Sequence, residues 1–291
     1  MDKNKLEYLI WIFFDNLVNR IGIKRIPTFA RALSALFYYT IPIRKETVVR
    51  NLSKAFPEKT DTEIKRLARK NYYSTAVTFL ELLILSRAST DDVLKMVECN
   101  ELELVKKRIS QNNGTLLLTA HVGNWELGAL YLGIMTDTAI NVLVKKQRNP
   151  YVAEWMTKLR EKMGNKEIML GASIRELFKT LSQGGVIGIV GDQRGPKDGI
   201  KVNFFNQPTL TFPGFAVLAL KKKVPILVGL SRRDSNGKYV VEITEIDFEN
   251  LPENNQDAIK ELNQRYMNIL EETVRKVPEQ WLWMHNIWKY Q

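Results

Sequence analysis

Two helical patterns, at 61–83 and 91–109, precede a region in which short apolar runs alternate with longer amphipathic stretches. The apolar runs have the length of buried strands, and the stretches between them have the spacing of helices with one apolar face. We predict strands at 115–120, 139–145, 168–170, 186–190, 225–231 and 239–246, and further helices at 125–135, 151–163, 173–181, 213–220 and 255–276. Strands separated by helices form βαβ units with parallel strands. The pattern therefore predicts an α/β fold whose central sheet is mostly parallel and is flanked by helices.

The first part of the chain has a different pattern, in which two apolar runs lie among basic residues. The runs cover residues 6–14 and 32–43, and both are shorter than the roughly 20 apolar residues that span a bilayer. Residues 1–54 contain ten lysines and arginines and four acidic residues, which gives +6 of the net charge of +11. Such segments are typical of helices that lie on an anionic membrane. We predict a membrane-associating helical segment at 1–54 and a main domain at 55–291; the alternative is a helical hairpin that covers the core.

The composition and the motifs that are absent exclude several classes of functional site. The chain has one cysteine, Cys99, which excludes an intrachain disulfide and a cysteine-rich zinc site. The motifs of P-loop nucleotide binding, of Gly-x-Ser-x-Gly hydrolases and of His-Glu-x-x-His zinc enzymes are absent. Gly184 and Gly185 precede a predicted strand, whereas a dinucleotide-binding motif joins a strand to a helix. We therefore predict no metal and no cofactor.

One of the two histidines, His121, stands at the end of the apolar run 115–120, and Glu126 follows on the first turn of the next predicted helix. Loops at the carboxyl ends of parallel strands carry the chemistry of open α/β sheets. A neutral imidazole can take a proton from a hydroxyl group near pH 7, and a carboxylate can hold it in one tautomer. We predict His121 as a general base and Glu126 as that carboxylate. The alternative is a structural histidine at a strand end.

Polar and basic residues follow two further predicted strands. Asp192, Gln193 and Arg194 come after one strand, and Arg148 and Asn149 come after another. The planar guanidinium of Arg194 suits a phosphate or a carboxylate. Asp192 can hold a hydroxyl group or position Arg194. Cations at two strand ends indicate an anionic substrate, whereas the alternative is a set of solvated polar turns.

Several short motifs occur in one order between about residues 45 and 289. They are Asn51-Leu52-x2-Ala55-Phe56-Pro57-Glu58, His121-x4-Glu126, Arg148-Asn149-Pro150, Gly191-Asp192-Gln193, Phe212-Pro213-Gly214 ahead of Ala219-Leu220-Lys221, Val224-Pro225-Ile226, and Pro278-Glu279-Gln280-Trp281-Leu282-Trp283. Each motif is weak alone, but in this order they resemble the lipid A late acyltransferase family. Position 126 is Glu where the glycerolipid relatives usually have Asp, which agrees with the lipid A branch.

The resemblance implies transfer of a fatty acyl group from acyl carrier protein, or from acyl-CoA, to a hydroxyl group of a lipid A precursor at the cytoplasmic face of the inner membrane. It also implies kinship with glycerophosphate-type acyltransferases. His121 would deprotonate the acceptor hydroxyl, and backbone N–H groups of Gly123 and Asn124, or a basic side chain, would stabilise the oxyanion. We expect the substrate-binding residues to be Asn124, Arg148, Asn149, Asp192, Gln193 and Arg194.

Three alternatives remain open from the sequence. Enzymes of this type also acylate lysophospholipids, aminolipids and other glycolipids, so the acceptor is the least certain part. A basic nucleic-acid-binding protein would use the positive charge to attract phosphate, but this explains neither the His121–Glu126 pair nor the apolar N-terminal runs. A catalytically silent membrane scaffold would not need that pair. We therefore predict no nucleic-acid partner, and a lipid acceptor and an anionic membrane surface as the partners besides the acyl donor.

Overall fold

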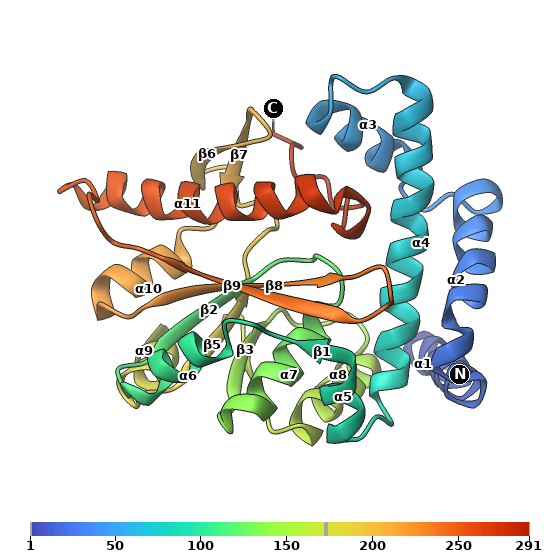
Figure 1. Cartoon of the computed structure of the whole chain (residues 1–291), viewed down its shortest axis with the longest axis horizontal. Helices are drawn as coiled ribbons and strands as arrows, with labels where there is room; N and C mark the ends of the chain where they lie inside the picture. The colour runs from blue at the N-terminus through green and yellow to red at the C-terminus, as the bar shows by residue number, and fades with distance from the viewer. Residues whose placement is uncertain (1, 172–173, 291) are drawn as a thin grey trace.

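The computed structural model describes residues 2–171 and 174–290, and its main feature is a seven-stranded sheet with the order β1-β9-β8-β2-β5-β3-β4 (Figure 1). The neighbouring strands pair in parallel, except that β8 and β9 are antiparallel. The strands are β1 (Val97–Glu98), β2 (Thr115–Thr119), β3 (Ile140–Val144), β4 (Lys166–Met169), β5 (Val186–Val190), β8 (Ile226–Arg233) and β9 (Tyr239–Ile246). The predicted α/β fold with a mostly parallel sheet is therefore confirmed.

The middle of the central strand β2 is apolar on both sides because helices cover both faces of the sheet. Leu116 and Leu118 belong to the core on one face, whereas Leu117 belongs to the core on the other, as the two-residue period of a strand requires. One face carries α9 (Ile174–Ser182), α10 (Gly214–Lys222) and α11 (Asn255–Lys276), and the other carries α5 (Thr90–Met96), α6 (Leu102–Ser110), α7 (Trp125–Thr136) and α8 (Pro150–Lys162). Figure 1 shows α11 and α7 on opposite sides of the strands.

The long helix α4 (Asp61–Leu85) joins the sheet to the N-terminal helices (Figure 1). It begins with a capping box, in which Thr60 and Glu63 satisfy each other's backbone N–H groups. The preceding elements are α1 (Lys3–Ile21), η1 (Ile23–Arg25), α2 (Ile26–Ala35), the π-turn η2 (Leu36–Thr40) and α3 (Lys45–Ala55). Val18 of α1 and Ala30 of α2 share a buried cluster with Val77 and Leu80 of α4. The first 54 residues are thus packed on α4, and the domain boundary at 54/55 stays a prediction.

The C-terminal residues fold back onto the sheet. A short helix, η3 (Pro278–Gln280), precedes Trp281 and Trp283, both of which are fully buried. Asn51 of α3 donates hydrogen bonds to the carbonyl oxygens of Trp283 and His285, at 2.9 Å and 2.7 Å. Contacts between segments more than 200 residues apart therefore tie α3 to the C-terminal segment.

Two predictions of secondary structure are wrong. The helix at 91–109 is interrupted, because Val97 and Glu98 pair with β9 as a short strand between α5 and α6. The loop after β5 contains a hairpin, β6 (Ile200–Phe204) and β7 (Gln207–Thr211), which has no long apolar run. The predicted helix start at Ser173 lies outside the described residues, as do the chain ends, Met1 and Gln291. Within the described parts of the chain, no helix combines the length and the apolar character that crossing a membrane requires.

Candidate active site

His121 and Asp192 form a pair at the carboxyl ends of two adjacent parallel strands. His121 follows β2 and Asp192 follows β5, and these strands are in register from Thr115 to Thr119. Nδ1 of His121 lies 2.7 Å from Oδ1 of Asp192, and the backbone N–H of His121 donates to Oδ2 at 2.8 Å. The indole N–H of Trp281 donates to the same Oδ2 at 2.8 Å. Asp192 is buried, and its ionised carboxylate requires the proton on Nδ1, which leaves Nε2 of His121 free to accept a proton.

The charges around His121 favour its protonated form. Burial alone would lower the pKa of His121, but the Coulomb attraction of Asp192, its hydrogen bond and the charge of Glu126 outweigh burial and raise that pKa. Burial likewise opposes ionisation of Asp192, and the interactions with His121 and with Trp281 keep the pKa of the Asp192 carboxyl below its usual value. The pair is therefore arranged to stabilise an imidazolium, as a general base needs when it has taken a proton.

Glu126 is not the carboxylate that orients His121, so that part of the sequence prediction is wrong. It lies on the first turn of α7 and forms a two-pronged ion pair with Arg160 of α8, whose Nε donates to Oε2 at 2.9 Å. Arg160 also pairs with Glu167, and its side chain is 11% exposed. Burial alone would lower the pKa of Arg160, but its two carboxylate partners raise it. Glu126 acts on His121 through its charge, without a hydrogen bond to the ring.

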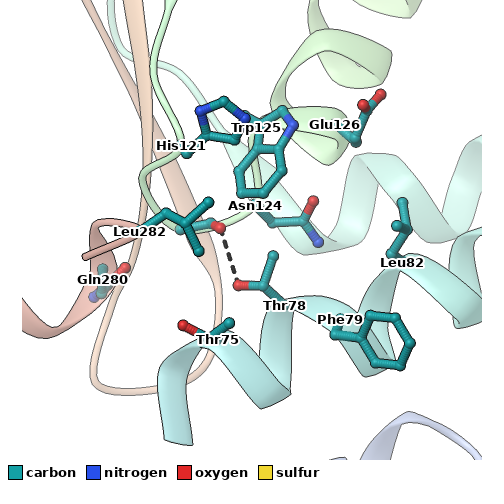
Figure 2. A pocket seen from close by; sticks show the side chains of 11 residues that line it. Thr75, Thr78, Phe79, Leu82, His121, Asn124, Trp125, Glu126, Gln280 and Leu282 are labelled. Carbon is teal, nitrogen blue, oxygen red and sulfur yellow. Dashed lines mark hydrogen bonds between the residues drawn. The ribbon is translucent and has the colours of Figure 1, made fainter. Parts of the chain in front are cut away.

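A cavity of about 220 Å³ lies between α4 and the loop that follows β2. Its lining residues are Thr75, Thr78, Phe79, Leu82, His121, Gly123, Asn124, Trp125, Glu126, Gln280 and Leu282. Figure 2 shows the four residues of α4 facing His121, Asn124 and Trp125 across this space. The Trp125 ring meets the His121 ring edge-on, with the centroids 4.6 Å apart. A mostly apolar cavity with His121 and a carboxylate at its wall is the arrangement of a site for an apolar substrate.

The turn between His121 and α7 is fixed by close packing. Gly123 has a φ of +54°, and a Cβ atom there would lie 2.0 Å from the carbonyl oxygen of Ser231, so no other residue fits. The N–H of Gly123 donates to the carbonyl oxygen of Gln280 at 3.0 Å, so the prediction that Gly123 is an oxyanion donor is wrong. The N–H groups of Asn124, Trp125 and Glu126 have no acceptor in residues 2–171 and 174–290, which leaves the start of α7 free to bind an anion.

The turn between His121 and α7 is held by a buried carboxylate of α4, which the sequence analysis did not identify. Glu81 of α4 accepts hydrogen bonds from the hydroxyl of Tyr239, at 2.5 Å, and from the side-chain amide of Asn124, at 3.3 Å. Oδ1 of Asn124 in turn accepts from the N–H of Leu127 and caps α7. Arg233 lies 3.9 Å from Glu81 and donates to Tyr239. Burial raises the pKa of Glu81, and the only signal in the sequence is one acid within the apolar run of 80–85.

The structure places Arg148 and Asn149 beside the N-terminal turns of α1 rather than on the wall of the cavity. Arg148 forms an ion pair with Glu7 at 2.9 Å, and the side-chain amide of Asn149 donates to Glu7 and to the carbonyl oxygen of Asn4. Oδ1 of Asn149 also accepts from the first N–H groups of α8. In this structure the two residues therefore fasten α1 to α8.

Arg194 lies beside the His121–Asp192 pair and is held by the C-terminal segment. Its backbone N–H donates to Nε2 of His285 at 2.9 Å, and its Nη1 donates to the carbonyl oxygen of Asn286. Burial lowers the pKa of His285, and Arg194 adds to the shift, so the ring is neutral and accepts this bond. Asp192 bonds to His121 and Trp281, so the idea that Asp192 positions Arg194 is wrong. Gln193 is exposed next to them.

Comparisons with known proteins identify the family of the chain. The model of the bacterial lipid A biosynthesis acyltransferase family matches residues 4–290. The lipid A biosynthesis lauroyltransferase of Escherichia coli (strain K12) is 26% identical over 251 residues, which cover 84% of this chain and 79% of the relative. The lipid A biosynthesis palmitoleoyltransferase of Escherichia coli (strain K12) and the lipid A biosynthesis acyltransferase of Shigella flexneri are each 25% identical, with the same coverage. The chain therefore belongs to the bacterial lipid A biosynthesis acyltransferase family.

Proposed function

We propose that this enzyme transfers a fatty acyl group from a thioester donor to a hydroxyl group of a lipid A precursor, with His121 as the general base. The observation that carries the proposal is the His121–Asp192 pair at the wall of an apolar cavity. Membership of the acyltransferase family and the names of its relatives supply the reaction class. The carrier of the thioester and the precise acceptor are finer parts of the same proposal.

The residues of the site suggest the following sequence of steps. Nε2 of His121 takes the proton of the acceptor hydroxyl as its oxygen attacks the thioester carbonyl, and Asp192 stabilises the imidazolium. The carbonyl oxygen becomes an oxyanion that the N–H groups at the start of α7 stabilise, together with the helix dipole. The carbon–sulfur bond then breaks, and the thiolate takes the proton from His121. The new ester and the free thiol leave.

Glu126 takes part in this proposal through its charge. It lines the cavity with His121 and contributes to the raised pKa of that residue. Arg160 keeps the Glu126 carboxylate in place, because both carboxylate oxygens accept its hydrogen bonds. We therefore keep Glu126 as a catalytic residue that stabilises the imidazolium, and assign the orientation of the ring to Asp192.

We also propose that the N-terminal helices bind the cytoplasmic face of the inner membrane. Large apolar side chains are exposed along the first 43 residues, and they are Leu6, Leu9, Ile10, Phe13, Phe14, Ile23, Phe29, Leu36, Tyr39, Ile41 and Ile43. The same segment carries a net positive charge. Exposed apolar patches of this kind mark interaction surfaces, and the cations suit an anionic leaflet.

The test is an acyl-transfer assay with the purified full chain. Donors would be acyl carrier protein and coenzyme A loaded with the same acyl group, and acceptors would be a lipid A precursor, a lysophospholipid and an aminolipid. Mass spectrometry would identify the product. We expect the lipid A precursor to be acylated, faster from the acidic carrier protein because the enzyme is basic. Turnover of a lysophospholipid or an aminolipid alone would assign a different acceptor, and turnover from CoA alone a different donor.

A further inference from the structure

Four basic side chains from three distant parts of the chain gather around the C-terminal segment. They are Arg44 before α3, Arg194 and Lys197 in the loop after β5, and Lys289 next to Tyr290. The guanidinium of Arg194 lies over the Tyr290 ring, 4.8 Å from its centroid, and the ammonium groups of Lys197 and Lys289 lie 5.7 Å and 5.8 Å from it. Nη1 of Arg44 donates to the carbonyl oxygen of Met284 at 3.1 Å. We infer that these four cations, the Tyr290 cluster, bind a phosphate group of the lipid acceptor.

The first argument is that the charges of the Tyr290 cluster are not neutralised within the described chain. Within residues 2–171 and 174–290, none of the four cations forms an ion pair with a carboxylate. The Nε of Arg194 is buried and also lacks an acceptor there. Like charges held together repel one another, and a bound anion would remove that cost.

The second argument is that the polypeptide holds the cluster in place. Arg44 has a φ of +55°, in the left-handed region that a non-glycine residue enters at a cost. Asn51 fastens the carbonyl oxygens of Trp283 and His285 to α3. Arg194 is fastened to His285 through its backbone N–H. A site built from such fixed parts loses little entropy when it binds a ligand.

The third argument concerns the position of the cluster. Arg194 is two residues from Asp192 and is bonded to His285, and His285 lies within electrostatic reach of Asp192, His121 and Arg44 as well. On the other side, Arg44 directly follows the exposed apolar side chains of Ile41 and Ile43. A lipid whose chains lie with that apolar surface in the membrane would have its head group at the cluster and its hydroxyl near His121.

The chemistry of the four groups favours phosphate. A guanidinium offers a planar fork of N–H donors that matches phosphate oxygens, and ammonium groups add point charges without a fixed geometry. Two guanidinium and two ammonium groups can neutralise a doubly charged phosphate. The binding itself does not depend on the reaction, whereas the identity of the ligand as the acceptor rests on the proposed function.

The first experiment measures binding alone, by calorimetry of inorganic pyrophosphate with the purified full chain at low salt. The variant Lys197→Gln/Lys289→Gln removes two charges of the cluster, and Lys166→Gln/Lys260→Gln removes two exposed charges elsewhere. We expect the Kd of pyrophosphate to rise by about tenfold or more in the cluster variant, since a single lost charged contact is already worth about tenfold. The control variant should bind like the parent. Equal binding by all three proteins, or no binding by the parent, would overturn the inference.

The second experiment uses steady-state kinetics to test whether the phosphate group that binds the cluster belongs to the acceptor or to the acyl donor. We expect the cluster variant to raise the KM for the phosphorylated acceptor about tenfold with little change in kcat, and to leave the KM of the acyl donor unchanged. An acceptor treated with phosphatase should bind parent and variant equally. A raised donor KM with an unchanged acceptor KM would overturn the assignment, because the cluster would then bind the carrier. If the parent transfers no acyl group to any acceptor, the proposed function fails while the pyrophosphate result stands.

Discussion

Nδ1 of His121 lies 2.7 Å from Oδ1 of Asp192, a residue 71 positions later in the chain, while Glu126 at five positions is bonded to Arg160 instead. The His121 ring is therefore oriented by a residue that follows the neighbouring strand β5. The nearer acid contributes charge to the site. This division of roles between two carboxylates can be tested one residue at a time.

The pH dependence of the parent and of Asp192→Asn tests the orienting pair. Only the neutral imidazole can take a proton, so kcat/KM should rise with pH through an apparent pKa above the usual 6.5 of histidine. Asp192→Asn removes the main interaction that favours the imidazolium, so the rising limb should move to lower pH. The plateau should also fall by about 10²–10⁴-fold, because the amide no longer fixes the tautomer.

The control for this prediction is Asp91→Asn, which removes an exposed carboxylate from α5 and should leave the pH profile unchanged. Circular dichroism and thermal unfolding would show that the Asp192 variant is folded. A rising limb at the same pH in Asp192→Asn and the parent would show that Asp192 does not set the pKa of the base.

Glu126→Gln tests the charge of the second carboxylate. The amide keeps the size of the side chain but removes its attraction for the imidazolium. We therefore expect kcat to fall while the KM of the acceptor changes little. Glu167→Gln is the matched control, because Glu167 binds the same Arg160 yet does not line the cavity. Steady-state kinetics of both variants would decide the matter: equal losses would mean that Glu126 serves only to hold Arg160.

The buried Glu81 is expected to position the turn before α7. The hydroxyl of Tyr239 and the amide of Asn124 both donate to Oε2 of Glu81, and Glu81→Leu removes this acceptor, so Asn124 should lose its anchor. We expect a fall in kcat and a loss of about 1–3 kcal/mol of stability, the usual cost of unsatisfied buried groups. Tyr239→Phe removes one donor and leaves the Asn124 contact, so its kcat should fall less. A larger kcat loss in Tyr239→Phe than in Glu81→Leu would contradict this role.

The inner strands of the sheet could be predicted from sequence because β2, β5 and the first half of β8 are mostly apolar runs. Val186–Val190 of β5 and Asn255–Lys276 of α11 have the predicted bounds. The β6–β7 hairpin escaped prediction because polar residues such as Lys201 and Asn203 interrupt its apolar positions, and only the cover of α11 makes it part of the core. Local pattern thus identifies apolar runs and regular amphipathic helices, and it misses short strands such as β1 and β6, where polar residues interrupt the pattern.

The candidate site was only partly predictable for a related reason. His121 and Asp192 were each recognisable at a strand end, but their contact depends on β2 lying next to β5, which no local pattern gives. The sequence distance favoured Glu126 as the partner, and the ion pair with Arg160 comes from the packing of α7 on α8. A basic residue after a predicted strand suggested that Arg148 binds a ligand, but in the structure its guanidinium forms an ion pair with Glu7 of α1.

The last prediction concerns the membrane surface of α1. Deleting the N-terminal residues would confuse the result, because Trp11 packs against Phe79 and Trp155, and Asp15 binds Ser86 of the α4 C-terminus. Point substitutions of outward-facing residues avoid this.

We therefore propose Leu9→Ser, Ile10→Ser and Phe13→Ser combined, at positions that are 47%, 51% and 63% exposed. The parent should float with anionic vesicles, and more weakly with zwitterionic ones or at high salt, because salt screens its cations. Each apolar side chain contributes about 1.5–3 kcal/mol when it is fully buried, so the triple variant should bind markedly less. Ile174→Ser removes a side chain from α9 that is more exposed than any of the three, and this variant should float like the parent. If the triple variant floats like the parent, α1 does not enter the membrane, and the enzyme must reach its lipid acceptor through another surface.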